Sequence, residues 1–275
     1  MELEINGQPA YAYTGGKPFD ASLPTVVFIH GAHNDHSVWG LQSRWFAHHG
    51  FGVLAVDLPG HGRSAGKPLP SIEDIADWIE LLLEKVMRSG IQTDGAGDTA
   101  KRVSLVGHSM GSLAVLECAA RHPARIARIA LFGTAVPMPV SDALLDAAKN
   151  DEPKAISMIN TWSHSPRAAM GGYAVPGIWH FGASRRLAER QKPGVLHNDL
   201  AACNAYGHGM DAAAAIACPV LIISGNRDMM TNPKAAARLA AALRDVRTVS
   251  LEGAGHVISE QPDAMLDTLR SFIAA

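Results

Sequence analysis

A series of short, almost continuously apolar runs constrains the fold of this chain more than any other feature. Such runs suit parallel strands that are buried on both faces, because a strand with one wet face would alternate polar and apolar residues. Helix-like stretches separate the runs, which is typical of a mostly parallel sheet covered by helices. The predicted strands are Thr25–Ile29, Val53–Val56, Val103–Val106, Ile126–Phe132, Val220–Ile223 and Val246–Leu251.

Capping residues and prolines predict the helices of the core. Ser71 stands before an acidic first turn, and Pro233 and Pro262 each stand where a helix would begin. The predicted helices span residues 71–87, 109–121, 232–243 and 261–272. Residues 91–98 are polar and glycine-rich, so we interpret them as a flexible surface loop.

The strand pattern is absent between Thr134 and Ala217, where helix-like segments are separated by glycine and proline. A helical insertion between two core strands would lie above the carboxyl edge of the sheet and act as a lid. We therefore predict a core of residues 1–133 and 218–275 and a helical cap of residues 134–217. The cap helices are predicted at Ser141–Lys149, Pro153–Trp162, Ala183–Gln191 and Val195–Tyr206.

Composition excludes several classes of protein. Hydrophobic residues make up 47% of the 275 residues, which is enough for a sizeable core. The chain has 24 Lys and Arg against 26 Asp and Glu, so it lacks the excess of positive charge that binds nucleic acid. The three cysteines fit reduced, buried thiols. With no signal peptide pattern and no membrane-spanning apolar run, we expect a cytoplasmic protein with no membrane partner and no cofactor or metal, which could form a homo-oligomer.

The strongest chemical signal is Gly107-His108-Ser109-Met110-Gly111, a G-x-S-x-G pattern between a predicted strand and a predicted helix. This context is that of a nucleophile turn, in which the serine is held in a strained conformation at the end of a strand. Side chains at 107 or 111 would collide with the neighbouring strand or helix. The following helix would direct its free N–H groups towards the group that Ser109 attacks.

A serine hydroxyl needs a base, and the base needs an acid that fixes its tautomer. His256 lies in a glycine-rich loop between the last predicted strand and helix, and it is the best base among 13 histidines. Asp228 follows the strand Val220–Ile223, where a carboxyl-end loop would place it. The three residues occur in the order Ser109, Asp228, His256. The long stretch of sequence between Ser109 and Asp228 is what a cap insertion would produce.

With these motifs the chain resembles the α/β-hydrolase fold superfamily over nearly all of its length. His30-Gly31-Ala32 resembles the oxyanion loop of that family, and residues 57–64, Asp-Leu-Pro-Gly-His-Gly-Arg-Ser, resemble its D-x-P-G-x-G-x-S turn. The resemblance implies a sheet of about eight strands and an oxyanion hole made by the backbone N–H groups of Ala32 and Met110. We assign Asp57, His61 and Arg63 to the structure of the turn.

Pocket residues are harder to predict. Aromatic cap residues favour a substrate with an apolar acyl or aryl group, although the same residues could form a core of the cap. His164, His180 and His208 could contact substrate or face solvent. The predicted pocket residues are His33, Trp39, His108, Trp162, Trp179 and Phe181.

A metal site is the competing interpretation of the oxyanion loop. Residues 31–36, Gly-Ala-His-Asn-Asp-His, approach the H-x-H-x-D-H motif of metallo-β-lactamase-like hydrolases, but glycine replaces its first histidine. We place His33, Asp35 and His36 at the mouth of the pocket or in solvent instead.

The predicted function is that of a carboxylesterase-type serine hydrolase, which cleaves a small to medium carboxylic ester, thioester or lactone through an acyl-enzyme. Relatives with this triad also hydrolyse C–C bonds or form peracids, and a ligand-binding protein without turnover is the alternative from another class. The metal-hydrolase alternative predicts inhibition by chelators.

Overall fold

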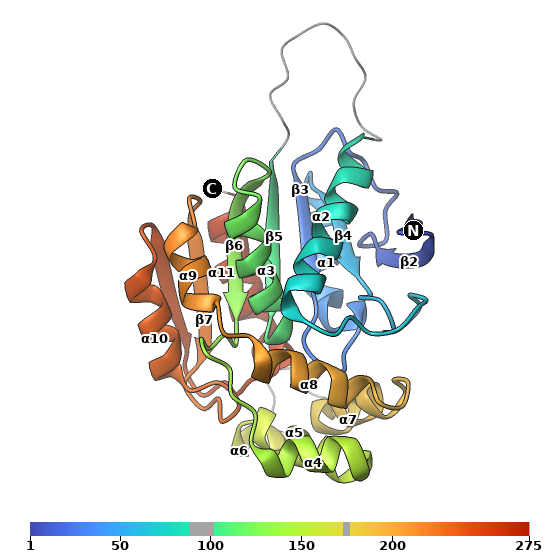
Figure 1. Cartoon of the computed structure of the whole chain (residues 1–275). Coiled ribbons are helices and arrows are strands. Elements are labelled where there is room, and N and C mark those ends of the chain that lie inside the picture. The colour runs from blue at the N-terminus through green and yellow to red at the C-terminus, as the bar shows by residue number, and fades with distance from the viewer. Residues whose placement is uncertain (89–101, 173–176, 275) are drawn as a thin grey trace, which may run out of the picture.

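A computed structural model describes residues 1–88, 102–172 and 177–274, and shows eight strands in one sheet (Figure 1). The strand order is β1-β2-β4-β3-β5-β6-β7-β8, and every neighbouring pair from β4 to β8 is parallel. This confirms the predicted α/β class. The strands are β1 (Glu2–Ile5), β2 (Gln8–Tyr13), β3 (Thr25–Ile29), β4 (Gly52–Val56), β5 (Val103–His108), β6 (Ile126–Phe132), β7 (Val220–Gly225) and β8 (Val246–Leu251).

The sequence analysis did not identify β1 and β2, which form an antiparallel hairpin at one edge of the sheet. Their residues alternate in burial instead of forming an apolar run. Asn6 and Gly7, with φ of 50° and 72°, make the tight turn between them. Asn-Gly is a characteristic pair for such a turn, so this signal was present in the sequence.

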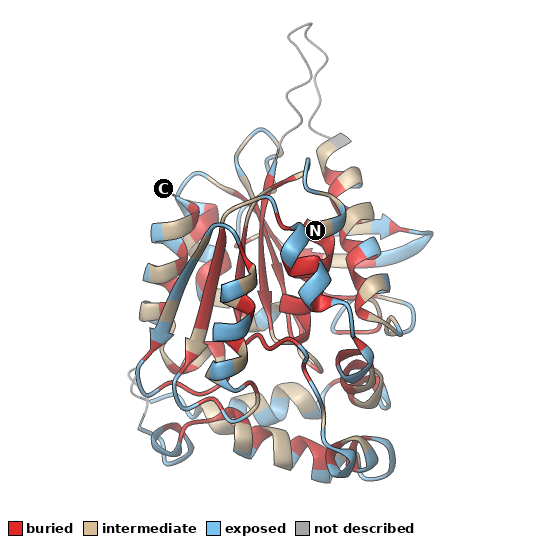
Figure 2. Cartoon of the chain, turned by 60° about the vertical axis from the view of Figure 1, so that its left-hand side comes forward, coloured by how far each residue is buried: buried red, intermediate tan, exposed pale blue. Residues whose placement is uncertain are grey.

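Helices cover both faces of the sheet (Figure 2). Buried side chains of α2, α3, α9 and α10 form one apolar core with the sheet, and those of α1 and α11 form a second core on the opposite face. All four predicted core helices are present, and α1 and α9 are additions. The helices of the core are α1 (Gly40–His48), α2 (Ile72–Arg88), α3 (Met110–Arg121), α9 (Gly209–Ala215), α10 (Pro233–Ala242) and α11 (Pro262–Ile273), with 3-10 turns η1 (His36–Trp39) and η2 (Ile258–Glu260).

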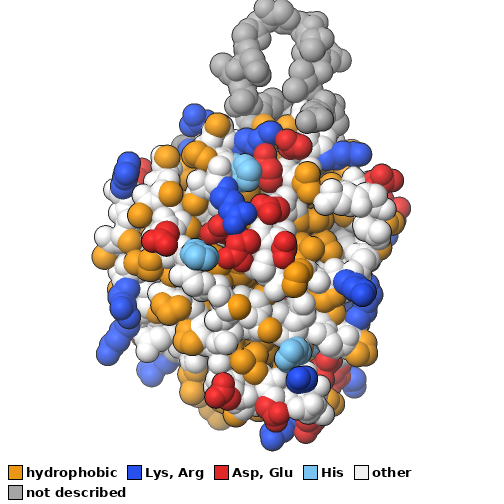
Figure 3. Space-filling model, viewed as in Figure 1, with side chains coloured by type: hydrophobic (Ala, Val, Ile, Leu, Met, Phe, Trp, Pro, Cys, Tyr) orange, Lys and Arg blue, Asp and Glu red, His pale blue; other side chains and the backbone are white. Residues whose placement is uncertain are grey.

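Helix α2 shows how local sequence places a helix on the sheet. The Ser71 hydroxyl accepts a hydrogen bond of 3.0 Å from the backbone N–H of Asp74, which satisfies one of the free donors of the first turn. Ile72, Ile75 and Ile79 lie on one face and are buried. The outer face carries charges of both signs, which are interspersed on this side of the molecule in Figure 3.

Six helices are described between β6 and β7, in residues 133–172 and 177–219, and most of them stand beyond the carboxyl ends of the parallel strands (Figure 1). We call α4 to α8, residues 142–205, the cap segment; α9 packs against α3 instead. Buried side chains including Leu144, Ile156 and Leu196 form an apolar cluster within the cap segment. Its helices are α4 (Asp142–Asn150), α5 (Glu152–Ser163), α6 (Pro166–Ala169), α7 (His180–Glu189) and α8 (Val195–Ala205).

The predicted division into residues 1–133, 134–217 and 218–275 stays a prediction. The predicted loop 91–98 lies outside the described residues. Among the helices in the described part of the chain, none is long and apolar enough to span a bilayer.

Helix α3 crosses the end of β5 at unusually short range. A Cβ added to Gly107 would lie 2.3 Å from the carbonyl oxygen of Gly111, and one added to Gly111 would lie 2.5 Å from the carbonyl oxygen of His30. Both contacts are with backbone, which cannot rotate away as a side chain can. The structure therefore confirms that a side chain at residue 107 or 111 would collide with neighbouring backbone.

We expect Gly107→Ala to lower the free energy of unfolding by about 2 kcal/mol or more, because the added methyl group forces the strand and helix apart. Gly40→Ala is the matched control, since its Cβ would meet nothing within 4 Å and its backbone is already helical, with φ −54° and ψ −45°. Urea denaturation of both variants checks the prediction. Equal midpoints for the two variants would contradict it.

Candidate active site

Ser109 connects the end of β5 to the start of α3. Its backbone has φ 51° and ψ −120°, a conformation that L-residues rarely adopt and that the surrounding structure must maintain. Gly31 provides the space beside it, because a Cβ at that position would lie 3.1 Å from Cβ of Ser109. The hydroxyl-bearing side chain lies at the wall of a cavity.

His256 and Asp228, 28 residues apart in the sequence, are joined by a hydrogen bond of 2.7 Å from Nδ1 to Oδ2. With its proton on Nδ1, the imidazole has an unprotonated Nε2, which is the form that a general base requires. Both side chains are buried, and His256 lines the same cavity as Ser109. Gly133 at the end of β6 gives the ring its place, because a Cβ there would lie 2.7 Å from Cε1 of His256.

Asp228 is held as a carboxylate. Burial by itself would raise its pKa, but the charge and hydrogen bond of His256, together with Thr231, hold the pKa below its ordinary value. Thr231 donates to this carboxylate twice, through its hydroxyl at 2.6 Å and its backbone N–H at 2.8 Å, and Met230 N–H donates at 2.7 Å. The acid is therefore oriented by a turn of its own loop.

His108 supports the base from the opposite side. Its Nε2–H donates to the backbone carbonyl of His256 at 2.9 Å, and the centroids of the two rings are 4.8 Å apart. Burial lowers the pKa of His108 to about 3, so the ring is neutral at pH 7. The residue next to the serine thus contacts the residue that would activate it.

The loop after β3 brings Ala32 to the wall of the cavity that Ser109 also lines. The following residue, His33, has a positive φ of 56°. Its backbone N–H donates to the carboxylate of Asp199 at 2.8 Å, so a residue of α8 fixes the loop. Met110 opens α3, where N–H groups have no partner within the helix. The oxyanion role of the N–H groups of Ala32 and Met110 stays a prediction.

Asp199 also forms a buried ion pair with His61. Nε2 of His61 lies 2.8 Å from Oδ2 of Asp199, while Nδ1 lies 3.0 Å from the carbonyl oxygen of Pro59. Since both ring nitrogens face acceptors, the ring donates from both and is charged. Burial would lower the pKa of His61, but Asp199 raises it above its ordinary value. His61 thus has the structural role expected for the turn after β4.

The cavity between the sheet edge and the cap segment has a volume of about 980 Å³. Side chains of the cap segment make much of its wall apolar, among them Leu144, Ile156 and Trp162. Of the predicted pocket residues, His33, His108 and Trp162 line it, as do His164 and His180. Among the described lining residues, the formally charged side chains are Arg185, Arg186 and Arg190.

Three predicted pocket residues lie elsewhere. Trp39 is fully buried in the core, where its ring packs 5.2 Å from that of Phe28. Trp179 is 65% exposed and stacks near Phe181, and neither is among the residues that line the cavity. An aromatic residue near a motif can as easily fill the core as face a ligand, and only the packing decides which.

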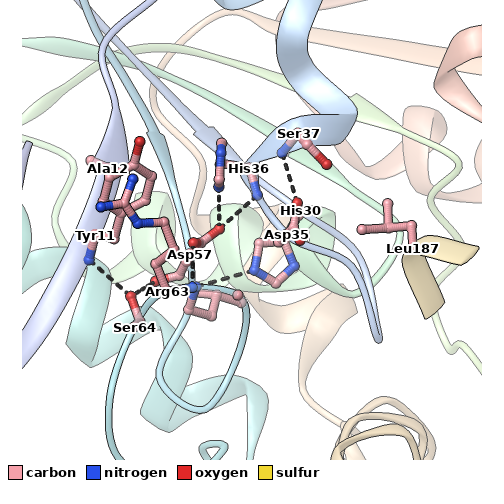
Figure 4. Close-up of polar contacts among 12 residues, drawn as sticks. Tyr11, Ala12, His30, Asp35, His36, Ser37, Asp57, Arg63, Ser64 and Leu187 are labelled. Carbon is pink, nitrogen blue, oxygen red and sulfur yellow. Dashed lines mark hydrogen bonds and ion pairs between the residues drawn. The ribbon is translucent and has the colours of Figure 1, made fainter. Parts of the chain in front are cut away.

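Two residues of the metal motif considered in the loop after β3, Asp35 and His36, lie beside Asp57, which follows β4. Ligand atoms of Asp35, His36 and Asp57 lie within 4.8 Å of one another. Protein groups already engage them. Nδ1 of His36 lies 2.7 Å from the carboxylate of Asp57 (Figure 4). Arg190 donates to Asp35 at 2.6 Å. Backbone N–H groups of His36 and Arg63 complete the shell of Asp57. The cluster is thus accounted for as the support of two loops.

Comparison with known proteins identifies the family of the chain. The sequence model described as "Alpha/beta hydrolase family" matches residues 26–268. The chain belongs to the alpha/beta hydrolase family. Among related α/β-hydrolases, a pimeloyl-[acyl-carrier protein] methyl ester esterase of Aromatoleum aromaticum is 25% identical over 85% of this chain and 91% of its own. A monoacylglycerol lipase of Mycolicibacterium smegmatis is 29% identical over 91% of this chain and 88% of its own.

Among solved α/β-hydrolase structures, the enol-lactonase from Burkholderia xenovorans LB400 superimposes with a TM-score of 0.83. It covers 100% of both chains at 23% sequence identity. At this identity the likeness concerns the fold.

Several site residues of this α/β-hydrolase were not identified from the sequence. Thr231 follows Asp228 by three positions, as a side chain that caps a turn often does, and so could have been suspected. Asp199 and Glu260 gave no such signal, because their partners lie in distant segments. His208, the third histidine considered as a possible substrate contact, is exposed and is not among the described residues that line the cavity.

Buried histidines predict that this α/β-hydrolase loses stability in acid. Burial lowers the pKa of His30 to about 4, of His33 to about 4 and of His108 to about 3. In the unfolded chain each would bind a proton near pH 6.5, so below that pH the unfolded state binds more protons. Stability should therefore fall as the pH is lowered from about 6.5 towards 4. His61 acts in the opposite direction, because its raised pKa makes the folded state bind its proton more tightly than the unfolded state does.

We expect a lower urea midpoint at pH 5 than at pH 7, and a smaller difference in His108→Gln, which has lost one of these groups. A midpoint that is equal or higher at pH 5 would contradict the prediction.

Proposed function

We propose that the chain is a serine hydrolase that cleaves small to medium carboxylic esters through an acyl-enzyme. The observation that carries the proposal is the 2.7 Å hydrogen bond between His256 and Asp228, at a cavity whose wall also contains the strained Ser109. The names of the two sequence relatives, a methyl ester esterase and a lipase, support the same class of reaction.

In the proposed first step, Oγ of Ser109 attacks the ester carbonyl carbon while its proton passes to Nε2 of His256. Asp228 holds the Nδ1–H and stabilises the imidazolium that forms. The tetrahedral oxyanion accepts hydrogen bonds from the N–H groups of Ala32 and Met110, and one such donor contributes about 3–4 kcal/mol. The C–O bond then breaks, and His256 returns the proton to the departing alcohol.

The second step releases the acid. His256 takes a proton from a water molecule, whose oxygen attacks the acyl carbon on Ser109. The intermediate collapses, the proton returns to Oγ, and a carboxylic acid leaves. Both steps use the same base and the same oxyanion donors. A thioester or lactone could enter the same sequence, because each offers an acyl carbon with a leaving group.

The residues that line the cavity support a narrower class of substrate. Apolar side chains such as Leu144, Ile156 and Trp162 offer contact to an alkyl or aryl acyl group. Arginines stand on the α7 side: Arg185 and Arg186 both pair with Glu189, at 2.7 and 2.9 Å, so two cations share one carboxylate. We propose an apolar acyl chain, with a preference for an acidic group at its far end.

Labelling with a fluorophosphonate tests the nucleophile. We expect the reagent to modify the peptide that contains Ser109, and Ser109→Ala to lose both labelling and at least about a thousandfold of the turnover of 4-nitrophenyl butyrate. Thermal melting of the variant controls for folding. Ligand binding without turnover in the unsubstituted protein would instead favour a binding protein, and loss of activity with a chelator would favour a metal hydrolase.

Paired substrates test the acidic group. We expect the ratio of kcat/KM for monomethyl adipate to that for methyl hexanoate to fall roughly two- to fivefold in Arg186→Gln, the size of an exposed charge pair. Arg247→Gln is the control, because Arg247 lies on the distant strand β8 and donates to Ser271 of α11. A ratio unchanged in Arg186→Gln and in Arg185→Gln would show that these arginines do not select the substrate.

A further inference from the structure

We propose that Glu260 is a positioning residue for the catalytic base, because it ties the loop of His256 to the cap segment. The inference rests on the proposed function, in which His256 moves the proton. Glu260 is the last residue of η2, four positions after His256, and it is 5% exposed. Its side chain is not needed to explain the triad itself.

Each carboxylate oxygen of Glu260 accepts a backbone hydrogen bond from a different segment. Oε1 accepts from the N–H of Ser165 at 2.8 Å, and Oε2 accepts from the N–H of Gly255 at 2.9 Å. Ser165 lies between α5 and α6 of the cap segment, whereas Gly255 directly precedes His256. Hydrogen bonds to a buried carboxylate are among the stronger ones in proteins. Glu260 therefore bridges two loops, and its two donors, Ser165 and Gly255, are 90 residues apart in sequence.

The backbone of His256 is held by the cap segment on one side and by β5 on the other. Its N–H donates to the carbonyl of Ser163 at 2.7 Å, and its carbonyl accepts from Nε2 of His108 at 2.9 Å. One peptide group is thus fixed by the cap segment and the other by the strand that carries Ser109. The imidazole projects from a backbone that has little freedom to shift towards or away from the hydroxyl.

Gly255 shows how closely the two loops approach. A Cβ at this position would lie 2.5 Å from the carbonyl oxygen of Ser163, and 2.9 Å from both Oε1 of Glu260 and the nitrogen of Ser165. The loops therefore meet backbone to backbone, and the Glu260 carboxylate accepts hydrogen bonds from an N–H group of each loop. A glycine-flanked histidine loop would otherwise be the most mobile part of the site, and reacting groups need placement to within a fraction of an ångström.

A purely structural role makes a different prediction. If Glu260 only stabilises the fold, its loss should lower the melting temperature but leave kcat unchanged in the molecules that remain folded. If it positions the base, its loss should lower kcat at temperatures well below melting. KM for a small ester should then change little, because Glu260 is not among the described residues that line the cavity.

The first variant is Glu260→Gln, which keeps the size of the side chain but has one acceptor oxygen for two N–H donors. We expect kcat for 4-nitrophenyl acetate to fall roughly ten- to hundredfold, with KM within about twofold of the unsubstituted protein. The rate of fluorophosphonate labelling should fall in parallel. Asp263→Asn is the control, an exposed carboxylate three residues further on that should leave kcat unchanged.

The second test removes the donor from the cap side. Ser165 has φ −64° and His164 has φ −105° and ψ 141°, values compatible with proline at 165 and with the residue before a proline. Ser165→Pro deletes the N–H that binds Glu260, and Ser165→Ala keeps it while removing the same capping hydroxyl. We expect Ser165→Pro to lower kcat at least fivefold relative to Ser165→Ala.

Hydrogen exchange completes the design, since it does not depend on activity. Peptides covering residues 252–261 should exchange faster in Glu260→Gln and in Ser165→Pro than in Ser165→Ala. Unchanged kcat in folded Glu260→Gln, or equal kcat in the two Ser165 variants, would overturn the inference while the proposed function stands. An unsubstituted protein with neither turnover nor labelling would overturn both, even if the exchange result showed that the bridge exists.

Discussion

The close approach of main chain to main chain at the end of β5 is the contact on which the rest of the site depends. Gly107 and Gly111 allow β5, α3 and the end of β3 to meet at backbone separations that exclude a side chain, and Gly31 lies close beside Ser109. This packing maintains the positive φ of Ser109 and sets α3 directly behind it. The strain at one residue is supported by many ordinary contacts, which is how a folded core can hold a reactive group.

A second principle of the structure is that buried polar groups connect segments that are distant in sequence. Asp199 joins α8 to the oxyanion loop through His33 and to the turn after β4 through His61. Glu260 joins the histidine loop to the cap segment. Because a buried carboxylate must find donors, each of these side chains constrains two loops together. Hydrogen bonds from the cap segment therefore help to fix the loops that contain His33 and His256.

Charge in the site is arranged by burial. Three buried histidines have lowered pKa values and are neutral, whereas His61 has a raised pKa because it faces a carboxylate. The pKa of Asp228 is held low by His256 and by a turn of its own loop. The same residue type thus serves as neutral donor or buried cation, according to the partners that the fold supplies.

The sequence alone determined the parallel strands β3 to β8, because apolar runs buried on both faces leave a clear pattern, but it missed the β1–β2 hairpin, whose residues alternate in burial. It also identified Ser109, Asp228 and His256 as candidates, because their motifs are local. The fates of Trp39 and Trp179, one buried in the core and one exposed, were decided only by tertiary packing. So was the role of Glu260, whose partners come from separate parts of the chain. Local sequence records backbone preference and strand burial, whereas a pocket wall or a bridging carboxylate depends on which distant segments the fold brings together.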